Sequence, residues 1–212
     1  MPPIGIFGGT FDPIHFGHLR LAEEMADALG LDRVVFIPAG QPPHRGQPQI
    51  SSTDRLEMVR RAIAGNPCFA ADDREVVSPN PSYTVDTLTA LRAELGPEQP
   101  LWLLLGADAF LGLPQWHNWR QLFELTNIVV ATRPTAADTQ IENLPEPLKS
   151  EVLKRQTAEI VAAGSVVRRQ MTPLDISATA IRATLAQRGS VRYLLPEAVL
   201  DYINEHQLYL QT

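Results

Sequence analysis

This sequence of 212 residues has a single cysteine, no long hydrophobic run and no excess of positive charge. Cys68 is the only cysteine, so the chain forms no intramolecular disulfide and no cysteine-rich zinc site, which is typical of proteins from a reducing cytoplasm. We expect its thiol to be buried and inert. No apolar run approaches the roughly 20 residues that span a bilayer, and no signal peptide is evident. The sequence therefore predicts a soluble cytoplasmic protein without a membrane partner.

The charge balance is acidic. Lysine and arginine number 18 against 24 aspartates and glutamates, which gives a formal net charge of −6 and a pI near 5.4. Proteins that bind nucleic acids broadly carry a basic surface, so we expect no nucleic-acid partner. An anionic ligand then has to be held by a few local positive charges and by backbone N–H groups.

Four short apolar runs, each bounded by glycine, proline or polar residues, predict buried strands. They are residues 4–7, 34–37, 101–105 and 128–131. Apolar residues at helical spacing lie between and after these runs. They predict helices over residues 21–29, 56–63, 85–95, 148–155, 178–187 and 196–206. Because strands and helices alternate, we expect an α/β fold, a Rossmann-like open parallel sheet with helices on both faces and a small C-terminal helical segment.

The length of the chain is enough to bury a large core, so we expect residues 1–212 to form one domain, with residues 172–212 as its C-terminal helical part. Residues 133–147 are rich in Thr, Ala, Asp and Pro and lack a period, which predicts a surface loop. A further strand is expected within residues 166–176. Nothing in the sequence indicates an oligomeric state.

The most informative stretch is residues 8–18, Gly-Gly-Thr-Phe-Asp-Pro-Ile-His-Phe-Gly-His, between the first strand and the first helix. Its two glycines let backbone N–H groups approach a ligand closely. His15 and His18, spaced by three, can reach one ligand from neighbouring positions of a turn. The glycine spacing matches neither the dinucleotide fingerprint nor the Walker A loop. The pattern favours a phosphate, whereas for Asp12 we expect a role in stabilising the turn.

Two other segments extend this interpretation. Ser177 can cap the helix that follows it, and Arg182 stands one turn later, so this helix start can form a second phosphate cradle. Gly106 and Asp108 follow the third predicted strand, and adjacent strands would place this loop and the glycine-rich loop around one crevice. Zinc is not expected, because the His-x-x-His pair lacks a third ligand at a suitable spacing. No pattern of a covalent nucleophile is present.

Taken together, Gly-Gly-Thr-Phe-Asp-Pro-x-His-x-Gly-His at residues 8–18 and Ile-Ser-Ala-Thr-x-Ile-Arg at 176–182 resemble the nicotinate-nucleotide adenylyltransferases of the nucleotidyltransferase superfamily. Ser-Tyr-Thr-Val-Asp-Thr-Leu at 82–88, Gly-Ala-Asp at 106–108, Trp116 and Arg-Pro at 133–134 also resemble that family. The resemblance runs over nearly the whole chain. One departure is Ala178, where many relatives have a second serine, and this removes one hydroxyl that could contact phosphate.

The resemblance implies adenylyl transfer from ATP to nicotinate mononucleotide, giving nicotinate adenine dinucleotide and pyrophosphate in NAD biosynthesis, with Mg²⁺ bound mainly through the ATP phosphates. It implies that His15, His18 and Arg182 are catalytic. The ATP-binding residues would be Gly9, Thr10, Phe11, His15, His18, Gly106, Asp108, Ser177 and Arg182. The residues that bind nicotinate mononucleotide would be Arg45, Tyr83, Thr84, Trp116 and Arg133. No residue would act as a dedicated metal ligand.

Trp116 has a physical reason of its own, since an indole face can stack on a cationic pyridinium ring. Two other acceptors, nicotinamide mononucleotide and pantetheine phosphate, remain open, because the residues of the ATP side say little about the acceptor. A protein that senses nucleotide without turning it over would present a similar ATP pocket. Pyrophosphate release distinguishes that protein from an enzyme.

Overall fold

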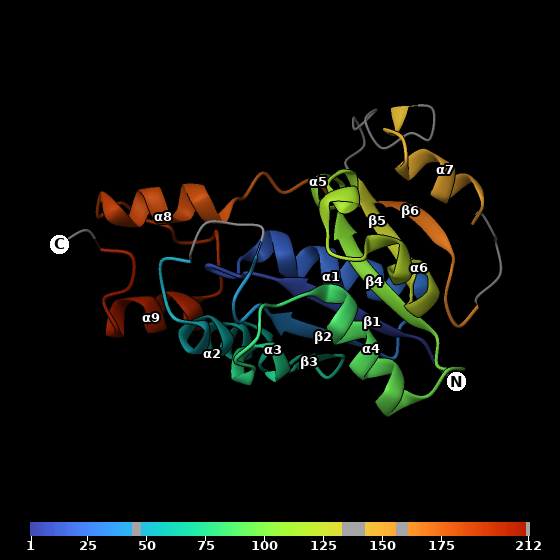
Figure 1. Cartoon of the computed structure of the whole chain (residues 1–212). Helices are drawn as coiled ribbons and strands as arrows, with labels where there is room; N and C mark the ends of the chain where they lie inside the picture. The colour runs from blue at the N-terminus through green and yellow to red at the C-terminus, as the bar shows by residue number, and fades with distance from the viewer. Residues whose placement is uncertain (44–47, 133–142, 156–160, 211–212) are drawn as a thin grey trace.

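The computed structural model describes residues 1–43, 48–132, 143–155 and 161–210. Six parallel strands form one sheet in the order β3-β2-β1-β4-β5-β6 (Figure 1). The strands are β1 (Ile4–Gly9), β2 (Arg33–Pro38), β3 (Phe69–Ala71), β4 (Leu101–Gly106), β5 (Asn127–Thr132) and β6 (Val166–Gln170). The helices are α1 (Phe16–Leu29), α2 (Ser52–Ile63), α3 (Arg74–Val77), α4 (Thr84–Leu95), α5 (Ala107–Leu111), α6 (Leu122–Leu125), α7 (Leu148–Leu153), α8 (Ala178–Ala186) and α9 (Glu197–Glu205), with 3-10 turns η1 (Leu113–Gln115) and η2 (Trp119–Gln121).

The chain starts in the middle of the sheet and builds outwards in both directions. From β1 it adds β2 and β3 on one side, then crosses back to add β4, β5 and β6 on the other. This order reverses between β1 and β4, where Ile4 pairs with Leu101 and Ile6 with Leu103. In open parallel sheets, ligands bind at such a reversal, beyond the carboxyl ends of the strands.

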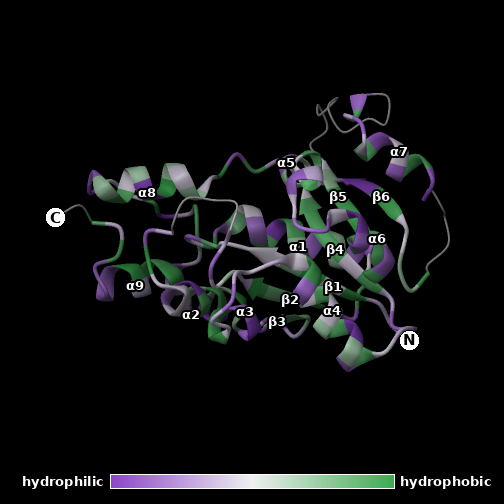
Figure 2. Ribbon diagram, viewed as in Figure 1, coloured by the Kyte–Doolittle hydropathy of each residue, from purple (hydrophilic) through white to green (hydrophobic). Residues whose placement is uncertain are grey.

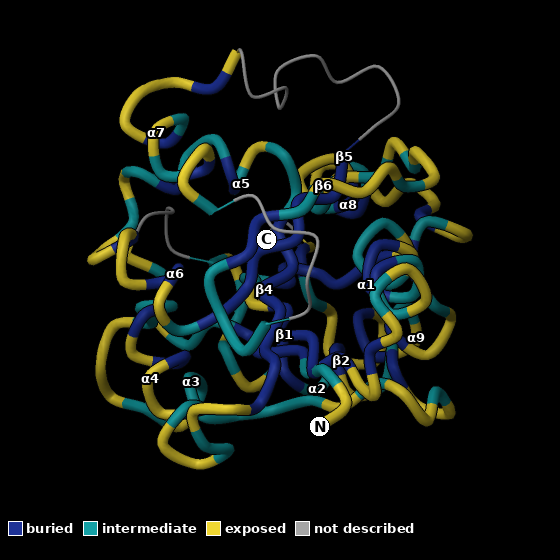
Figure 3. The backbone as a smooth tube through the Cα atoms, turned by 90° about the vertical axis from the view of Figure 1, so that its right-hand side faces the viewer, coloured by how far each residue is buried: buried dark blue, intermediate teal, exposed yellow. Residues whose placement is uncertain are grey.

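Two apolar cores lie on opposite faces of the sheet. One contains buried residues of α1, α2, α8 and α9, and the other contains buried residues of α4, α5, α6 and α7. Along β1 the side chains alternate, so Phe7 enters the first core and Ile6 the second. Figure 2 shows apolar residues concentrated along the strands, and Figure 3 shows buried backbone at the sheet and exposed backbone on the outer helices. Helices therefore cover both faces, and the predicted Rossmann-like α/β fold is confirmed.

Helix ends follow their local sequence. Gly30 ends α1 with a left-handed φ of 59° and donates its N–H to carbonyls of the last turn. Ser51 caps α2 by accepting a hydrogen bond from the N–H of Asp54 at 3.0 Å. Ser177 caps α8 in the same way through the N–H of Ala180, at 3.2 Å. The predicted cap of α8 is thereby confirmed.

The C-terminal helices lie together at one end of the molecule (Figure 1). Helix α9 packs against α2, where the Tyr202 hydroxyl donates to Asp54 Oδ1 at 2.9 Å and the Arg61 guanidinium lies 4.6 Å from the Tyr202 ring centre. Within the described ranges, no helix is long and apolar enough to cross a membrane. The assignment of residues 1–212 to a single domain stays a prediction.

Several expectations need correction or addition. Cys68 is exposed, so the expectation of a buried thiol was wrong. Cys68 directly precedes the short edge strand β3, which the sequence did not predict. The short helices α3, α5 and α6 were also not predicted, because four or five residues do not establish a helical period. Residues 133–142 of the predicted loop lie outside the described residues.

Candidate active site

The carboxyl ends of β1 and β4 lie side by side, as expected from the crevice predicted between their loops. A Cβ atom added at Gly8 or at Gly106 would meet nothing within 4 Å, so the backbone at both strand ends borders open space. Gly106 is also the residue before the first turn of α5, in which the side chain of Asp108 is exposed. The two strand ends thus leave room for a ligand to approach main-chain groups closely.

Gly9 has a different role from Gly8. A Cβ at Gly9 would lie 2.9 Å from the ring of Phe11, which is 2% exposed and has a left-handed φ of 50°. The Phe11 ring packs edge-on against Phe7, with ring centres 5.5 Å apart. A larger residue at position 9 would therefore displace the buried Phe11 ring from its place against the strand. The predicted contacts of Gly9, Thr10 and Phe11 with ATP stay predictions.

His15 and His18 do share one face at the start of α1. Their rings stack with centres 3.8 Å apart and planes 26° apart. The backbone N–H of His15 donates to Nδ1 of His18 at 3.3 Å, which places the ring proton of neutral His18 on Nε2. That nitrogen can then donate to a phosphate oxygen.

Burial separates the two histidines chemically. His15 is 6% exposed, and burial lowers its pKa from 6.5 to about 4. Its Nδ1 has no hydrogen-bond partner among the described residues. At neutral pH, His15 is therefore an uncharged imidazole, and it contributes packing rather than positive charge.

Arg182 joins the two ends of the chain at this site. Its Nη1 donates to the backbone oxygen of Asp12 at 2.6 Å, and its Nη2 to Thr179 Oγ1 at 3.4 Å. A Cβ on Gly17 would lie 3.6 Å from the backbone oxygen of Ile176, so the start of α1 faces the segment leading into α8. The structure thus brings His15, His18, Ser177 and Arg182 into one region.

A buried arginine fixes the loops from the other side. Arg55 of α2 is 1% exposed and donates to the backbone oxygens of Thr10 at 2.6 Å, Ala39 at 2.5 Å and Gly40 at 3.2 Å. It therefore ties the loop after β1 to the loop after β2. Sequence reasoning missed this residue, although a charge beside Leu56 and Val59 on the apolar face of a helix is a recognisable anomaly.

The expected acceptor side lies at the start of α4. Tyr83 precedes its first turn, and its ring lies over that of His117, with centres 4.5 Å apart. This contact brings residues 83–84 to the turn that contains the half-buried Trp116. His117 was not predicted, and its only sequence signal is its position next to that tryptophan. Arg45 and Arg133, the two cations expected here, lie outside the described residues.

Ser82 lies just before α4, but its side chain does not cap that helix. Its hydroxyl instead accepts the backbone N–H groups of Gly40 at 2.9 Å and Gln41 at 3.1 Å. A Cβ on Gly40 would lie 1.9 Å from the backbone oxygen of Glu75, so only glycine fits where the loop after β2 meets α3. These contacts hold the start of α4 against the loop whose oxygens Arg55 binds.

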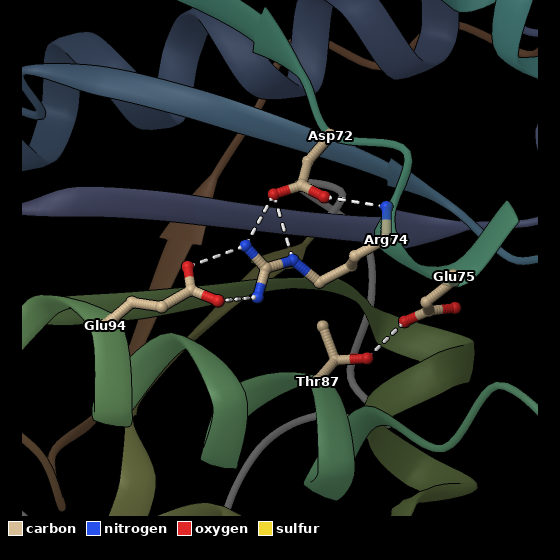
Figure 4. A network of polar contacts seen from close by, with 5 residues as sticks. All are labelled: Asp72, Arg74, Glu75, Thr87 and Glu94. Carbon is tan, nitrogen blue, oxygen red and sulfur yellow. Dashed lines mark hydrogen bonds and ion pairs between the residues drawn. The ribbon is translucent and has the colours of Figure 1, made fainter. Parts of the chain in front are cut away.

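An ionic network fastens α3 to α4 beside this region (Figure 4). The Arg74 guanidinium binds Asp72 Oδ2 at 2.7 Å and Glu94 at 3.0 Å, and these carboxylates raise the pKa of Arg74. Thr87 of α4 donates to Glu75 at 2.5 Å, and burial raises the pKa of that carboxyl group. The network borders a surface hollow of about 740 Å³. Because the charges of Arg74, Asp72 and Glu94 are already paired with one another, the network serves to hold α4 in place.

Within the described ranges, no group of three or more His, Cys, Asp or Glu side chains could hold a metal ion. The region offers backbone N–H groups at open strand ends, two imidazoles, a capped helix start and an arginine. This set of donors suits a polyphosphate.

Comparisons with known proteins agree with this chemistry. A profile of the cytidylyltransferase-like family matches residues 6–184. A probable nicotinate-nucleotide adenylyltransferase of Dechloromonas aromatica (strain RCB) is 55% identical over 212 residues, which cover 98% of this chain and 97% of that protein. A protein of Halorhodospira halophila (strain DSM 244 / SL1) with the same description is 51% identical, covering 97% of this chain and 94% of its own length.

Solved structures share the fold at low identity. Plasmodium falciparum nicotinic acid mononucleotide adenylyltransferase complexed with NaAD superposes with a TM-score of 0.76 at 18% identity, covering 99% of this chain and 98% of that chain. The same enzyme complexed with APC gives a TM-score of 0.73. The similarity extends over the sheet and both C-terminal helices.

Proposed function

The chain belongs to the nicotinate-nucleotide adenylyltransferase family, and on that premise we propose that its site transfers the adenylyl group of ATP to nicotinate mononucleotide. The products are nicotinate adenine dinucleotide and pyrophosphate. The observation that carries this proposal is the meeting of the His15–His18 pair with Arg182 at the point where the strand order reverses. The low cysteine content supports a location in the cytoplasm.

The reaction proceeds by direct displacement. A phosphate oxygen of nicotinate mononucleotide attacks the α-phosphorus of ATP in line and forms the new P–O bond. The bond from the α-phosphorus to the bridging oxygen breaks, and its electron pair leaves with pyrophosphate. No enzyme side chain becomes covalently attached, because the substrate supplies the nucleophile. The protein contributes positioning and electrostatic stabilisation.

Each residue of the ATP side has a distinct part in this step. His18 donates from Nε2 to the α-phosphate, whose oxygens gain charge in the transition state. His15 stays neutral and supports the His18 ring by stacking. Arg182 and the capped start of α8 at Ser177 hold the β- and γ-phosphates through charge and N–H groups. Gly106 and Asp108 meet the ribose of ATP.

Mg²⁺ fits this site as an ion held mainly by the substrate. Mg²⁺ keeps several waters and is commonly bound by phosphates and one or two carboxylates, so a dedicated protein cage is not needed. The described residues offer no such cage, so the phosphates of ATP would supply most of the contacts to the ion. When bound, the ion would neutralise part of the charge on the triphosphate.

The acceptor side is proposed at the start of α4. The Trp116 indole can stack on the cationic pyridinium ring. Tyr83 and Thr84 would hold the nicotinate ring and its carboxylate. The His117 ring, which lies against that of Tyr83 at a tilt of 34°, extends this aromatic surface. Arg45 and Arg133 remain proposed partners of the mononucleotide phosphate.

The test is an acceptor profile with ATP and Mg²⁺. Initial rates of pyrophosphate release are measured with nicotinate mononucleotide, nicotinamide mononucleotide and pantetheine phosphate. We expect the acid mononucleotide to give the highest kcat/KM, because a charged carboxylate dominates selectivity when buried donors match it. Faster turnover of the amide or of pantetheine phosphate would overturn the acceptor assignment. ATP binding without pyrophosphate release, with all three acceptors tested, would favour a nucleotide sensor.

A further inference from the structure

The carboxylate of Asp12 is held by segments far from it in the sequence. Asp12 lies in the loop after β1 and is 6% exposed. Its Oδ1 accepts the hydroxyl of Tyr209 at 2.6 Å, and its Oδ2 accepts the backbone N–H of Gln49 at 3.1 Å. Tyr209 is 197 positions away along the chain. A side chain that merely stabilised its own turn would bond to N–H groups two or three residues away.

Tyr209 is also held in a defined position by its surroundings. It is 8% exposed and has a left-handed φ of 64°, which residues other than glycine adopt only where their surroundings hold them. Burial, followed by the Asp12 carboxylate, raises the pKa of its hydroxyl. The hydroxyl is therefore a permanent hydrogen-bond donor at neutral pH. A buried carboxylate needs such donors, since its charge is costly without them.

The main chain of Asp12 holds the phosphate-binding arginine. The backbone oxygen of Asp12 accepts Arg182 Nη1 at 2.6 Å, and Asp12 Oδ2 lies 3.9 Å from the same nitrogen. The side chain and the backbone carbonyl group of Asp12 are attached to the same Cα atom, so a change in the position of one affects the other. Fixing the carboxylate from the C-terminal segment therefore also fixes the acceptor that orients the guanidinium.

From these contacts we propose that Asp12 and Tyr209 are positioning residues for adenylyl transfer: the Tyr209 hydroxyl anchors Asp12, and Asp12 orients the Arg182 guanidinium toward the ATP phosphates. This inference rests on the proposed function, in which Arg182 binds ATP. Neither residue touches the reacting atoms. The last described segment of the chain thereby acts on the loop that follows the first strand.

The test variant is Tyr209→Phe, which removes one oxygen atom. We expect kcat to fall about tenfold, within the range of up to about 100-fold that small misplacements of reacting groups cause, while KM for nicotinate mononucleotide stays within about twofold. Tyr202→Phe is the matched control. It removes a hydroxyl from the same C-terminal part that also bonds to a carboxylate, Asp54 Oδ1 at 2.9 Å, but that carboxylate lies on α2. We expect its kcat and KM values to remain those of the wild type.

A double-variant cycle tests whether the effect passes through Arg182. In the Arg182→Ala background, Tyr209→Phe should lower kcat no further, because no guanidinium remains to be oriented. An unchanged kcat in the single Tyr209→Phe variant, an equal loss in Tyr202→Phe, or a full tenfold loss in the Arg182→Ala background would each overturn the proposal.

Two further measurements keep the outcome decisive. If Tyr209→Phe fails to fold, the same cycle is run with Asp12→Asn, which keeps the size of the side chain but cannot accept hydrogen bonds at both ends. The ATP dissociation constant, measured by calorimetry, is a second readout that requires no turnover. We expect the substitution to raise this constant when Arg182 is present and to leave it unchanged in the Arg182→Ala background. An inactive wild type refutes the proposed function, whereas an active wild type with additive variants refutes the positioning role alone.

Discussion

At the scale of single residues, burial decides what a side chain contributes. His15 and His18 are equivalent in the sequence, three positions apart at the start of one helix. In the fold, His15 is 6% exposed and has a pKa of about 4, whereas His18 accepts a backbone hydrogen bond that fixes its tautomer. This difference in environment is why the proposed function gives His15 a supporting part and His18 the contact with the α-phosphate.

The buried His15 predicts a pH dependence of stability. Its pKa is about 4 when folded and 6.5 when unfolded, so the unfolded state binds more protons between these values. The contribution of neutral His15 is complete above pH 6.5 and is lost as the pH falls toward 4. Between pH 7 and pH 4.5 we expect this residue to account for ~2 kcal/mol of lost stability.

Urea unfolding of the wild type and of His15→Asn at these two pH values checks this number. The variant, which cannot be protonated at this position, should lose ~2 kcal/mol less than the wild type on acidification. Equal losses in the two proteins would show that His15 is not held neutral by burial.

At the scale of elements, the site depends on how neighbouring loops are tied together. The loop after β1 and the loop after β2 both present backbone oxygens to Arg55, and the second loop is also held by Ser82. The backbone at Gly8 and at Gly106, at the ends of β1 and β4, still borders open space. A loop that binds phosphate through main-chain groups needs such support, because its N–H groups must be in place before the ligand arrives.

Arg55→Lys should therefore destabilise the protein by ~2–3 kcal/mol, because an ammonium group cannot reach three carbonyl oxygens in the geometry of a planar guanidinium. Arg60→Lys on the same helix is the control. Its side chain is 50% exposed and pairs with Asp73 at the surface, so we expect a change within ~0.5 kcal/mol. Chemical unfolding of both variants measures the difference. Similar values for the two substitutions would contradict the role given to Arg55.

At the scale of the whole molecule, the proposed ATP side is assembled from both ends of the chain. Sequence patterns alone predicted much of the fold and several residues of the candidate site. The four apolar runs became β1, β2, β4 and β5, and the open sheet followed from their alternation with helices. His15, His18, Ser177 and Arg182 were identifiable because each motif is local: a histidine spacing, or a helix cap followed by a cation.

Other parts could not be predicted because their cause is not local. Strand β3 has three residues, of which Ala70 is exposed, and it exists because β2 offers an open edge. Tyr209 has no neighbouring pattern that points to Asp12, and Arg55 finds its carbonyl oxygens only after two loops have folded. The roles of Tyr209 and Arg55 can be identified only from a structure, which shows contacts between residues that are far apart in the sequence.

In the proposed function, His18 from the first helix and Arg182 from the C-terminal part act on the same ATP molecule. The most direct test is kcat/KM for pyrophosphate release, with ATP and nicotinate mononucleotide, in the wild type, His18→Ala, Arg182→Ala and the double variant. We predict losses of about 100-fold or more in each single variant and a double loss well below their product, because groups that act as one unit are not additive. Near wild-type turnover in a folded single variant, or fully multiplicative losses, would contradict the account.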